Sequence, residues 1–174
     1  MQAGRHLGPP PVLLTARLRL RAPLLSDWPA YAAFMASPRS RHMGGPFDTH
    51  RAWHDFCQDT ALWSLTGAGG LMITDRETGT TLGQVAISQG PRFPETELGW
   101  LLYDGAEGRG FAGEAACALR DWAMGPGGCA TLVSYIAPGN LRSAALARRM
   151  GATVDPDATP QDPGDLVFRH PRPA

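Results

Sequence analysis

The residues best suited to chemistry lie between 107 and 115, in the sequence Glu-Gly-Arg-Gly-Phe-Ala-Gly-Glu-Ala. Small residues let a backbone bend so that several N–H groups point at one spot, and a helix that begins there adds the positive end of its dipole. The side chain of Arg109 would add a charge-assisted contact. This stretch therefore predicts a site for a phosphate or diphosphate. The alternative is a tight strand-to-helix connection that holds no ligand.

Gly108, Gly110 and Gly113 also match the G-x-G-x-x-G pattern of dinucleotide-binding folds. That pattern needs an acidic residue about 20 positions further on, at the end of the next strand, to bind the ribose. Residues 131–137 contain none. A nicotinamide-dependent oxidoreductase is therefore a disfavoured alternative.

The elements that must position the glycine-rich stretch follow from apolar periodicity and from turn and cap residues. In chain order we expect a strand over 12–22, helices over 28–36 and 49–65, strands over 71–75, 80–88 and 96–103, a helix over 114–124, a strand over 129–136, a helix over 141–150 and a last strand over 166–170. Only the strand–helix–strand unit over 96–136 requires a parallel pair of strands. The sequence therefore predicts an α/β protein with a mixed sheet.

Composition excludes several classes of protein. The 174 residues include 16 acidic and 16 basic ones, the latter all arginine, for a net charge of zero. A nonspecific nucleic-acid binder needs a basic excess, so we expect no nucleic-acid partner. No apolar run is long enough to span a bilayer, so we expect no membrane partner. Cys57, Cys117 and Cys129 are an odd and scattered set, which indicates free buried thiols in a cytoplasmic protein.

His50, His54 and Cys57 fall on one face of the helix expected over 49–65. Their H-x-x-x-H spacing differs from that of zinc proteases, because Arg51 stands where the catalytic glutamate would be. We therefore expect a partly exposed helix face here and no metal site.

Several segments together resemble the GNAT N-acetyltransferase superfamily. Residues 107–112 are similar to its Q/R-x-x-G-x-G/A signature, and residues 97–102 are similar to its fourth strand. Residues 140–143, Asn-Leu-Arg-Ser, followed by 149–152, are similar to its downstream N-x-x-S … G motif. Residues 15–21 resemble the opening strand of the branch typified by ribosomal-protein N-terminal acetyltransferases (RimJ/RimL type).

This resemblance covers nearly the whole chain and implies a fold. We expect a single domain over residues 12–174, preceded by a flexible lead-in over residues 1–11. The family fold implies a mostly antiparallel mixed sheet of about six to seven strands with one splayed parallel pair, flanked by about four helices. A homodimer is compatible with this expectation.

The resemblance also implies acetyl-CoA as co-substrate and an amine as acceptor, either a protein N-terminus or a small molecule. The diphosphate would lie on the amides of the glycine-rich turn, and the pantetheine arm would pair with the open end of the strand over 96–103. Asn140 would contact the arm, and Ser143 would lie near the thioester sulfur. The residues implied to bind the cofactor are Trp100, Leu101, Leu102, Gly108, Arg109, Gly110, Phe111, Ala112, Gly113, Asn140 and Ser143.

Two features depart from the family pattern. Glu107 stands where the signature has Gln or Arg, and a carboxylate there would repel a diphosphate unless it points away. No Tyr follows Gly151, where many relatives carry the general acid, and the nearby Tyr135 precedes the motif. These departures leave open a second hypothesis, a catalytically silent GNAT-like module that binds CoA.

Acetyl transfer needs a neutral amine and a proton for the leaving thiolate. An α-amino group has a reference pKa near 7.7–8, so roughly a tenth of it is neutral at pH 7. A carboxylate acting through water therefore suffices as the base. We expect Glu97 to be this base, with Glu95 on the same side of the strand, and Ser143 to give the thiolate its proton. The structural alternatives are a solvated strand residue for Glu97 and a helix-start residue for Ser143.

Overall fold

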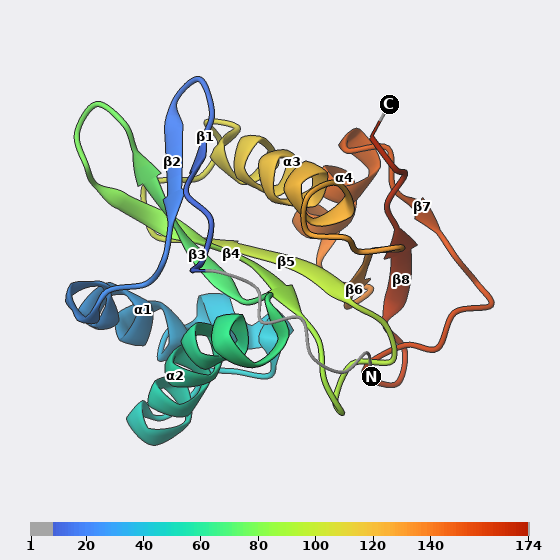
Figure 1. The fold of residues 1–174 in the computed structure, drawn as a ribbon. Helices are drawn as coiled ribbons and strands as arrows, with labels where there is room; N and C mark the ends of the chain where they lie inside the picture. Colours follow the sequence, from blue (N-terminus) through green and yellow to red (C-terminus); the bar gives the residue numbers. More distant parts are fainter. Residues whose placement is uncertain (1–8, 174) are drawn as a thin grey trace.

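The computed structural model describes residues 9–173, which form one sheet with helices on both faces (Figure 1). Most of the lead-in expected over residues 1–11 lies outside the described residues. In chain order the elements are β1 (Leu13–Leu14), β2 (Leu18–Arg21), η1 (Leu25–Asp27), α1 (Trp28–Met35), η2 (Pro38–Met43), α2 (Thr49–Thr66), β3 (Gly70–Asp75), β4 (Thr81–Ser88), β5 (Glu97–Leu102), α3 (Phe111–Met124), β6 (Val133–Ile136), α4 (Leu141–Arg149), β7 (Thr153–Val154) and β8 (Leu166–Arg169), where η marks a 3-10 helix.

The strands form one mixed sheet in the order β1-β2-β3-β4-β5-β6-β8-β7. Neighbouring strands are antiparallel except β5 and β6, which run parallel because α3 connects them. β5 pairs with β4 along its whole length, from Glu97 to Leu102. Its pairing with β6 is recorded at one residue pair, Glu97↔Val133. The expected mixed sheet with one splayed parallel pair is confirmed.

Apolar clusters on the two faces of the sheet hold the helices in place. Figure 1 shows α1 and α2 on one face and α3 and α4 on the other. Alternate side chains of β5 point to opposite faces of the sheet, so Leu98 packs on the side of α3 and Leu101 on the side of α1 and α2. Burying these side chains is the main stabilising term of the fold. The fully buried large side chains are Tyr31, Phe111, Phe168, Leu18, Leu20, Met35, Leu71, Met72, Ile73, Ile87, Leu98 and Leu119.

The strand count exceeds the expected six to seven, because eight strands are present. The single strand expected over 12–22 is wrong: the chain turns back between β1 and β2, where the Thr15 N–H donates to the Leu18 carbonyl at 2.9 Å. Alternation continues through the turn, so periodicity alone cannot reveal it. The short β7 lies in a segment where no strand was expected and pairs with β8. The strand expected over 129–136 begins only at Val133.

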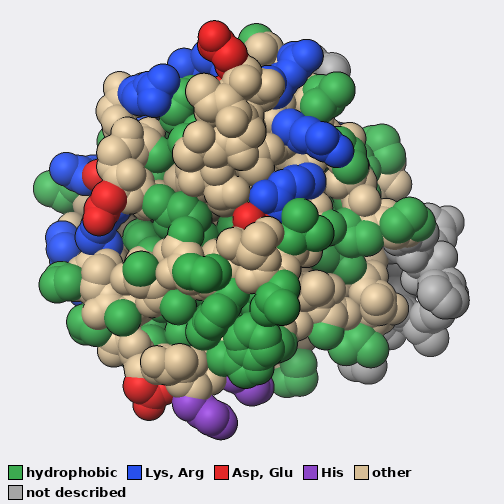
Figure 2. All heavy atoms as spheres, turned by 90° about the vertical axis from the view of Figure 1, so that its left-hand side faces the viewer, with side chains coloured by type: hydrophobic (Ala, Val, Ile, Leu, Met, Phe, Trp, Pro, Cys, Tyr) green, Lys and Arg blue, Asp and Glu red, His purple; other side chains and the backbone are tan. Residues whose placement is uncertain are grey.

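The surface agrees with the balanced composition. On the face that Figure 2 shows, the arginines lie in several separate groups with neutral and acidic side chains between them. Within residues 9–173, no helix has both the length and the apolar character needed to cross a membrane.

Candidate active site

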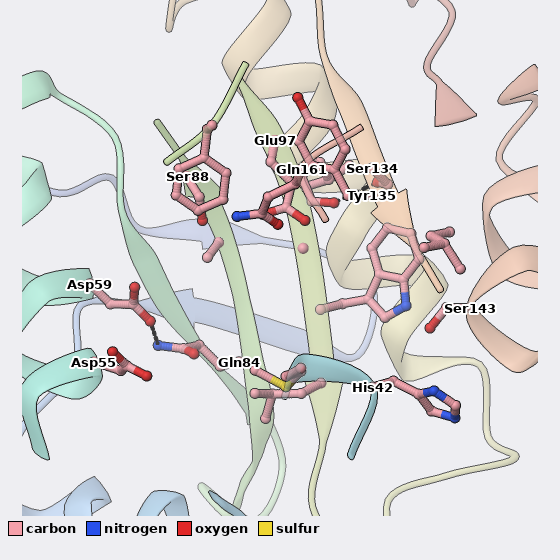
Figure 3. A pocket seen from close by; sticks show the side chains of 18 of the residues that line it. His42, Asp55, Asp59, Gln84, Ser88, Glu97, Ser134, Tyr135, Ser143 and Gln161 are labelled. Carbon is pink, nitrogen blue, oxygen red and sulfur yellow. Dashed lines mark hydrogen bonds between the residues drawn. The ribbon is translucent and has the colours of Figure 1, made fainter. Parts of the chain in front are cut away.

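A pocket of about 240 Å³ opens where β5 and β6 separate (Figure 3). Open sheets commonly bind ligands where neighbouring strands diverge at the end of a strand–helix–strand unit. Side chains from α2, η2, β4, β5, β6 and the start of α4 line it. Five of the residues singled out in the sequence share this pocket: Glu97, Trp100, Leu101, Asn140 and Ser143.

The glycine-rich turn leaves the backbone N–H groups at the start of α3 available. Gly108 and Gly110 have φ of +75° and +79°, a left-handed conformation that glycine adopts without steric cost. Gly110 is the N-cap of α3, and no side chain caps this helix start. The amides of Phe111, Ala112 and Gly113 therefore point out of the helix with its dipole behind them. This donor set fits a diphosphate.

Arginines surround the start of α3. The guanidinium groups of Arg17 and Arg109 each lie 4.6 Å from the ring centre of the buried Phe111. Arg17 also donates to the backbone oxygen of Arg109 at 2.9 Å and to the carboxylate of Glu114 at 2.7 Å. Glu114 is the acidic residue in the first turn of α3, and this pairing neutralises it. The helix start thus keeps a positive character, which favours an anionic ligand.

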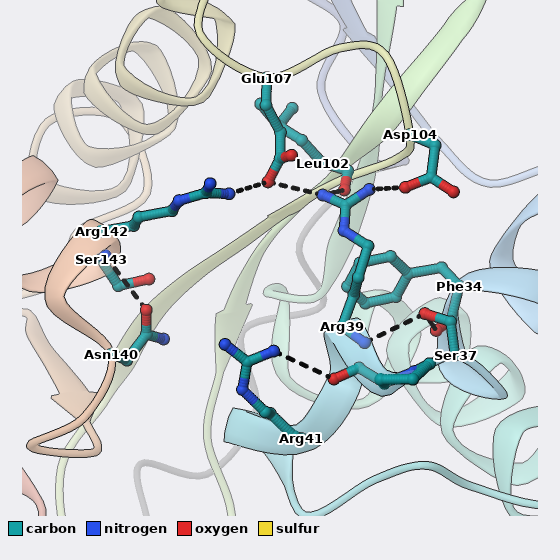
Figure 4. Close-up of polar contacts among 11 residues, drawn as sticks. Phe34, Ser37, Arg39, Arg41, Leu102, Asp104, Glu107, Asn140, Arg142 and Ser143 are labelled. Carbon is teal, nitrogen blue, oxygen red and sulfur yellow. Dashed lines mark hydrogen bonds and ion pairs between the residues drawn. The ribbon is translucent and has the colours of Figure 1, made fainter.

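Glu107 points away from the start of α3 and into an arginine network (Figure 4). Its Oε1 lies 2.7 Å from Nη2 of Arg39 and 3.0 Å from Nη1 of Arg142. Arg39 also pairs with Asp104 and donates to the backbone oxygen of Leu102 at 2.8 Å. Two guanidinium groups therefore neutralise the carboxylate that departs from the family signature. Its effect on a neighbouring diphosphate is correspondingly small.

Asn140 and Ser143 lie together at the start of α4. Asn140 is the N-cap, and its Oδ1 accepts a hydrogen bond from the Ser143 N–H at 3.2 Å. This local pairing explains the fixed spacing of the two residues, because an N-cap side chain reaches the N–H three positions on. Both residues line the pocket. The hydroxyl of Ser143 lies at the wall opposite Asp59 (Figure 3).

Glu97 lies at the first position of β5 and lines the same pocket. Burial raises the pKa of its carboxyl group to about 7, and the negative charges of Asp59 and Asp165 add to the rise. The backbone N–H of Tyr135 and the cation of Arg92 oppose it. A carboxylate with a pKa near neutrality is well matched to accept a proton from an ammonium group.

Asp59, which the sequence reasoning missed, faces the pocket from α2. Its Oδ2 accepts a hydrogen bond from Nε2 of Gln84 at 3.1 Å. Burial raises the pKa of Asp59 to about 7, with Gln84 opposing the rise and Asp55 adding to it. Asp55 lines the same wall. The i, i+4 spacing of the two aspartates was a usable signal, because it places both on one helix face.

Other residues considered in the sequence have different surroundings. Tyr135 also lines the pocket. The hydroxyl of Tyr135 accepts a hydrogen bond from the Glu95 N–H at 2.9 Å, which occupies it away from the start of α4. Cys57 is exposed, so the expectation that all three thiols are buried is wrong, while Cys117 and Cys129 pack against the main core. In the part of the chain that the structure describes, no group of three or more His, Cys, Asp or Glu could hold a metal ion.

The comparison with family models decides the family. Residues 17–153, well over half of the chain, match the model described as the acetyltransferase (GNAT) domain. The chain belongs to the GNAT acetyltransferase family. The resemblance seen in the motifs is thereby confirmed, and acetyl-CoA is the acetyl donor that this GNAT fold implies.

Solved GNAT structures agree with this assignment. The chain is 52% identical to an acetyltransferase from Agrobacterium tumefaciens, with a TM-score of 0.91 over 99% of this chain and 100% of that one. It has the same fold as RimL, a ribosomal L7/L12 α-N-protein acetyltransferase solved with coenzyme A, at 18% identity, a TM-score of 0.73 and coverage of 94% and 97%. It also shares the fold of a spermidine N-acetyltransferase from Vibrio cholerae solved with CoA and spermine, at 13% identity, a TM-score of 0.70 and coverage of 89% and 94%. No curated protein matches the chain significantly.

Proposed function

We propose that this GNAT protein transfers the acetyl group of acetyl-CoA to a primary amine by direct attack in a ternary complex. The acceptor is a protein N-terminus or a small-molecule amine. The observation that carries the proposal is the Glu97 carboxylate, which has a pKa near 7 and lines a pocket that also holds Asn140 and Ser143. When bound, acetyl-CoA supplies a thioester carbonyl that a neutral amine can attack.

The start of α3 would hold the cofactor's diphosphate. The amides of Phe111, Ala112 and Gly113, together with the peptide groups of Gly108 to Gly110, form the donor set, and the guanidinium of Arg109 adds a cation. The edge of β5 from Trp100 to Leu102 would pair with the pantetheine arm, because β6 has already diverged from it. Asn140 would contact the arm while it caps α4.

Glu97 would remove the proton from the bound ammonium group, directly or through water. At pH 7 a group with a pKa near 7 is about half ionised, so it can take up a proton and release it again in each cycle. Ser143 would give the leaving thiolate its proton from the first turn of α4. The dipole of α4 favours a developing negative charge at this point.

The wall formed by Asp55 and Asp59 supports a cationic acceptor. An ammonium group that leaves water must keep an opposite charge or hydrogen-bond acceptors near it. Asp59 and Glu97 line the same pocket, and the negative charge of Asp59 contributes to the raised pKa of Glu97. The amine would therefore enter as an ammonium ion between the two carboxylates and lose its proton to Glu97.

The test measures thiol release from acetyl-CoA against a panel of amines. The panel holds peptides with free N-termini, the same peptides with blocked N-termini, polyamines and amino acids. The chain contains no lysine, so its own side chains offer no competing primary amine. We expect thiol release that depends on a free amine, with an acetyl group added to that amine by mass spectrometry. Calorimetric CoA binding without thiol release for any amine would instead identify a silent CoA-binding module.

A further inference from the structure

The carbonyl of Leu98 marks the point at which β6 leaves β5. The Val133 N–H donates to the Thr96 carbonyl at 3.1 Å, and Glu97 pairs with Val133. A parallel ladder that continued by two residues would bring the Tyr135 N–H to the Leu98 carbonyl. The side-chain hydroxyl of Ser134 takes that place and donates to the Leu98 oxygen at 2.5 Å. A hydroxyl has therefore replaced a ladder hydrogen bond at the start of the splay.

His170 holds the Ser134 hydroxyl from behind. Its Nε2 lies 2.8 Å from Ser134 Oγ, and both residues are buried. The hydroxyl proton goes to the Leu98 carbonyl, so Nε2 must carry a hydrogen and donate it to Oγ. Burial, with a contribution from Arg120, lowers the pKa of His170 to about 4, which keeps the ring neutral at neutral pH. The ring also packs edge-on against Trp100, with 6.5 Å between ring centres.

The replaced ladder bond has a consequence for Glu97. The N–H groups of residues two apart in a strand point the same way, so the Tyr135 N–H faces β5 as the Val133 N–H does. Because Leu98 already has a donor, this N–H is left on the side of Glu97, whose charged form it favours. The side chain of Tyr135 is held in place by its hydrogen bond with the Glu95 N–H. Glu97, Ser134 and Tyr135 lie close together at one end of the pocket in Figure 3.

We propose that Ser134 and His170 are positioning residues for Glu97. Ser134 binds the Leu98 carbonyl and His170 holds Ser134 there, so β6 is kept from pairing further with β5 and the Tyr135 N–H is left for the Glu97 carboxylate. This inference rests on the proposed function only in that it gives Glu97 the role of base. Both residues are buried, and Ser134 lies in the pocket wall. Both act through the backbone of β5 and β6.

The remaining charges around Glu97 come from other elements and stay in place when Ser134 or His170 is changed. Asp59 faces it from α2, Asp165 from the loop before β8 and Arg92 from the loop before β5. The other charged or titratable side chains in the pocket walls are Tyr31, His42, Arg51, Asp55, Asp162 and Tyr135. A change in the Glu97 pKa in a Ser134 variant therefore reports on the position of β6.

The experiment titrates the Glu97 side chain directly. The chain has five glutamates, so carbon-13 labelling of glutamate gives five carboxyl signals, and the Glu97→Gln variant identifies the one from Glu97. In Ser134→Ala, β6 can move to satisfy the Leu98 carbonyl with the Tyr135 N–H. We expect the Glu97 pKa to rise by about one pH unit, which is what a hydrogen bond to a carboxylate is commonly worth. Ser134→Thr keeps the hydroxyl and should leave the value within about 0.3 pH unit.

His170→Leu provides a second variant, which removes the donor behind Ser134 and keeps an apolar side chain there. We expect the Glu97 pKa to move in the same direction by a smaller amount, and the acid limb of kcat/KM to move with it. A Glu97 titration unchanged in Ser134→Ala, or in His170→Leu if the first variant does not fold, overturns the positioning role. An undiminished acetyl-transfer rate in Glu97→Gln would instead contradict the proposed function, whatever the titration shows.

Discussion

Replacing Glu97 with Gln should make the protein more stable and less active. Burial in the pocket wall raises the pKa of this carboxyl from an ordinary value of 4.5 to about 7. Between these two values the folded protein binds more protons than the unfolded chain, so the free energy of unfolding falls as the pH rises through this window. Above pH 7 the ionised carboxylate is a net cost to the fold, and the neutral amide of Gln removes that cost.

The size of the effect follows from the same pKa. A rise from 4.5 to about 7 corresponds to a ceiling of about 3 kcal/mol at about 1.4 kcal/mol for each pH unit. Glu97 lines an open pocket, and water there reduces the cost, so we expect a gain of about 2 kcal/mol at pH 8.5. In a domain of this size that gain raises Tm by about 4–8 °C. Near pH 4.5 Glu97 is protonated in the folded protein and half ionised in the unfolded chain, so the gain should shrink to about 0.4 kcal/mol and the two Tm values should nearly coincide.

The assay is thermal unfolding at pH 4.5 and pH 8.5, paired with the thiol-release rate at pH 8.5. Glu95→Gln is a matched control from the residues just before β5. The Arg169 guanidinium, which donates to both carboxylate oxygens at 2.8 Å, lowers the pKa of Glu95, so its neutral variant should lose stability at pH 8.5. A Glu97→Gln protein that gains no stability at pH 8.5 relative to pH 4.5 would refute the raised pKa of this carboxyl group. A stabilised variant with full activity would refute its role as base.

Three further substitutions test the rest of the site. Ser143→Ala should lower kcat at least about tenfold while calorimetric CoA binding stays unchanged, because the hydroxyl acts on the leaving thiolate; an unaltered kcat contradicts that role. Asp59→Asn should raise KM for the amine by about tenfold with a smaller change in kcat, since it removes one charge that binds the ammonium ion; an equal loss in both parameters would point to a role in the chemistry itself. Glu107→Gln should leave the Kd for CoA unchanged or lower it. The variant should cost under about 1 kcal/mol of stability, because it breaks partly exposed ion pairs with Arg39 and Arg142. Weakened CoA binding would show instead that this carboxylate orders the cofactor site.

Local sequence signals predicted the glycine-rich turn before α3 and the turn that begins α4. A glycine at a left-handed position and an N-cap followed by a Ser three residues later are written into a few consecutive residues, so they can be recognised without the fold. The mixed sheet with its parallel pair followed from the element order alone. The division of residues 12–22 into the two strands β1 and β2 could not be predicted, because the apolar alternation continues through the turn between them.

The acceptor side depended on contacts between distant residues. Asp59 from α2 meets Gln84 from β4 and faces Glu97 from β5, and no local pattern connects these positions. Arg39 reaches Glu107 across 68 positions of sequence, which is why the departure from the family signature looked more serious in the sequence than in the fold. Contacts between residues far apart in the sequence are seen only in the folded structure, whereas helix caps and turns can be recognised from the spacing of a few consecutive residues.

The splay of β5 from β6 concentrates features that a fold selected for stability alone would remove. A regular ladder would satisfy the Leu98 carbonyl without a buried Ser134–His170 pair, and an apolar residue at 97 would avoid a half-buried carboxylate with a raised pKa. The N-cap of α3 carries no side-chain acceptor, although such caps commonly stabilise a helix by about 1 kcal/mol. Costs of this kind persist where they serve binding or chemistry. Ser134 and Glu97 both line one pocket, so they support the location of the active site independently of any resemblance to other proteins.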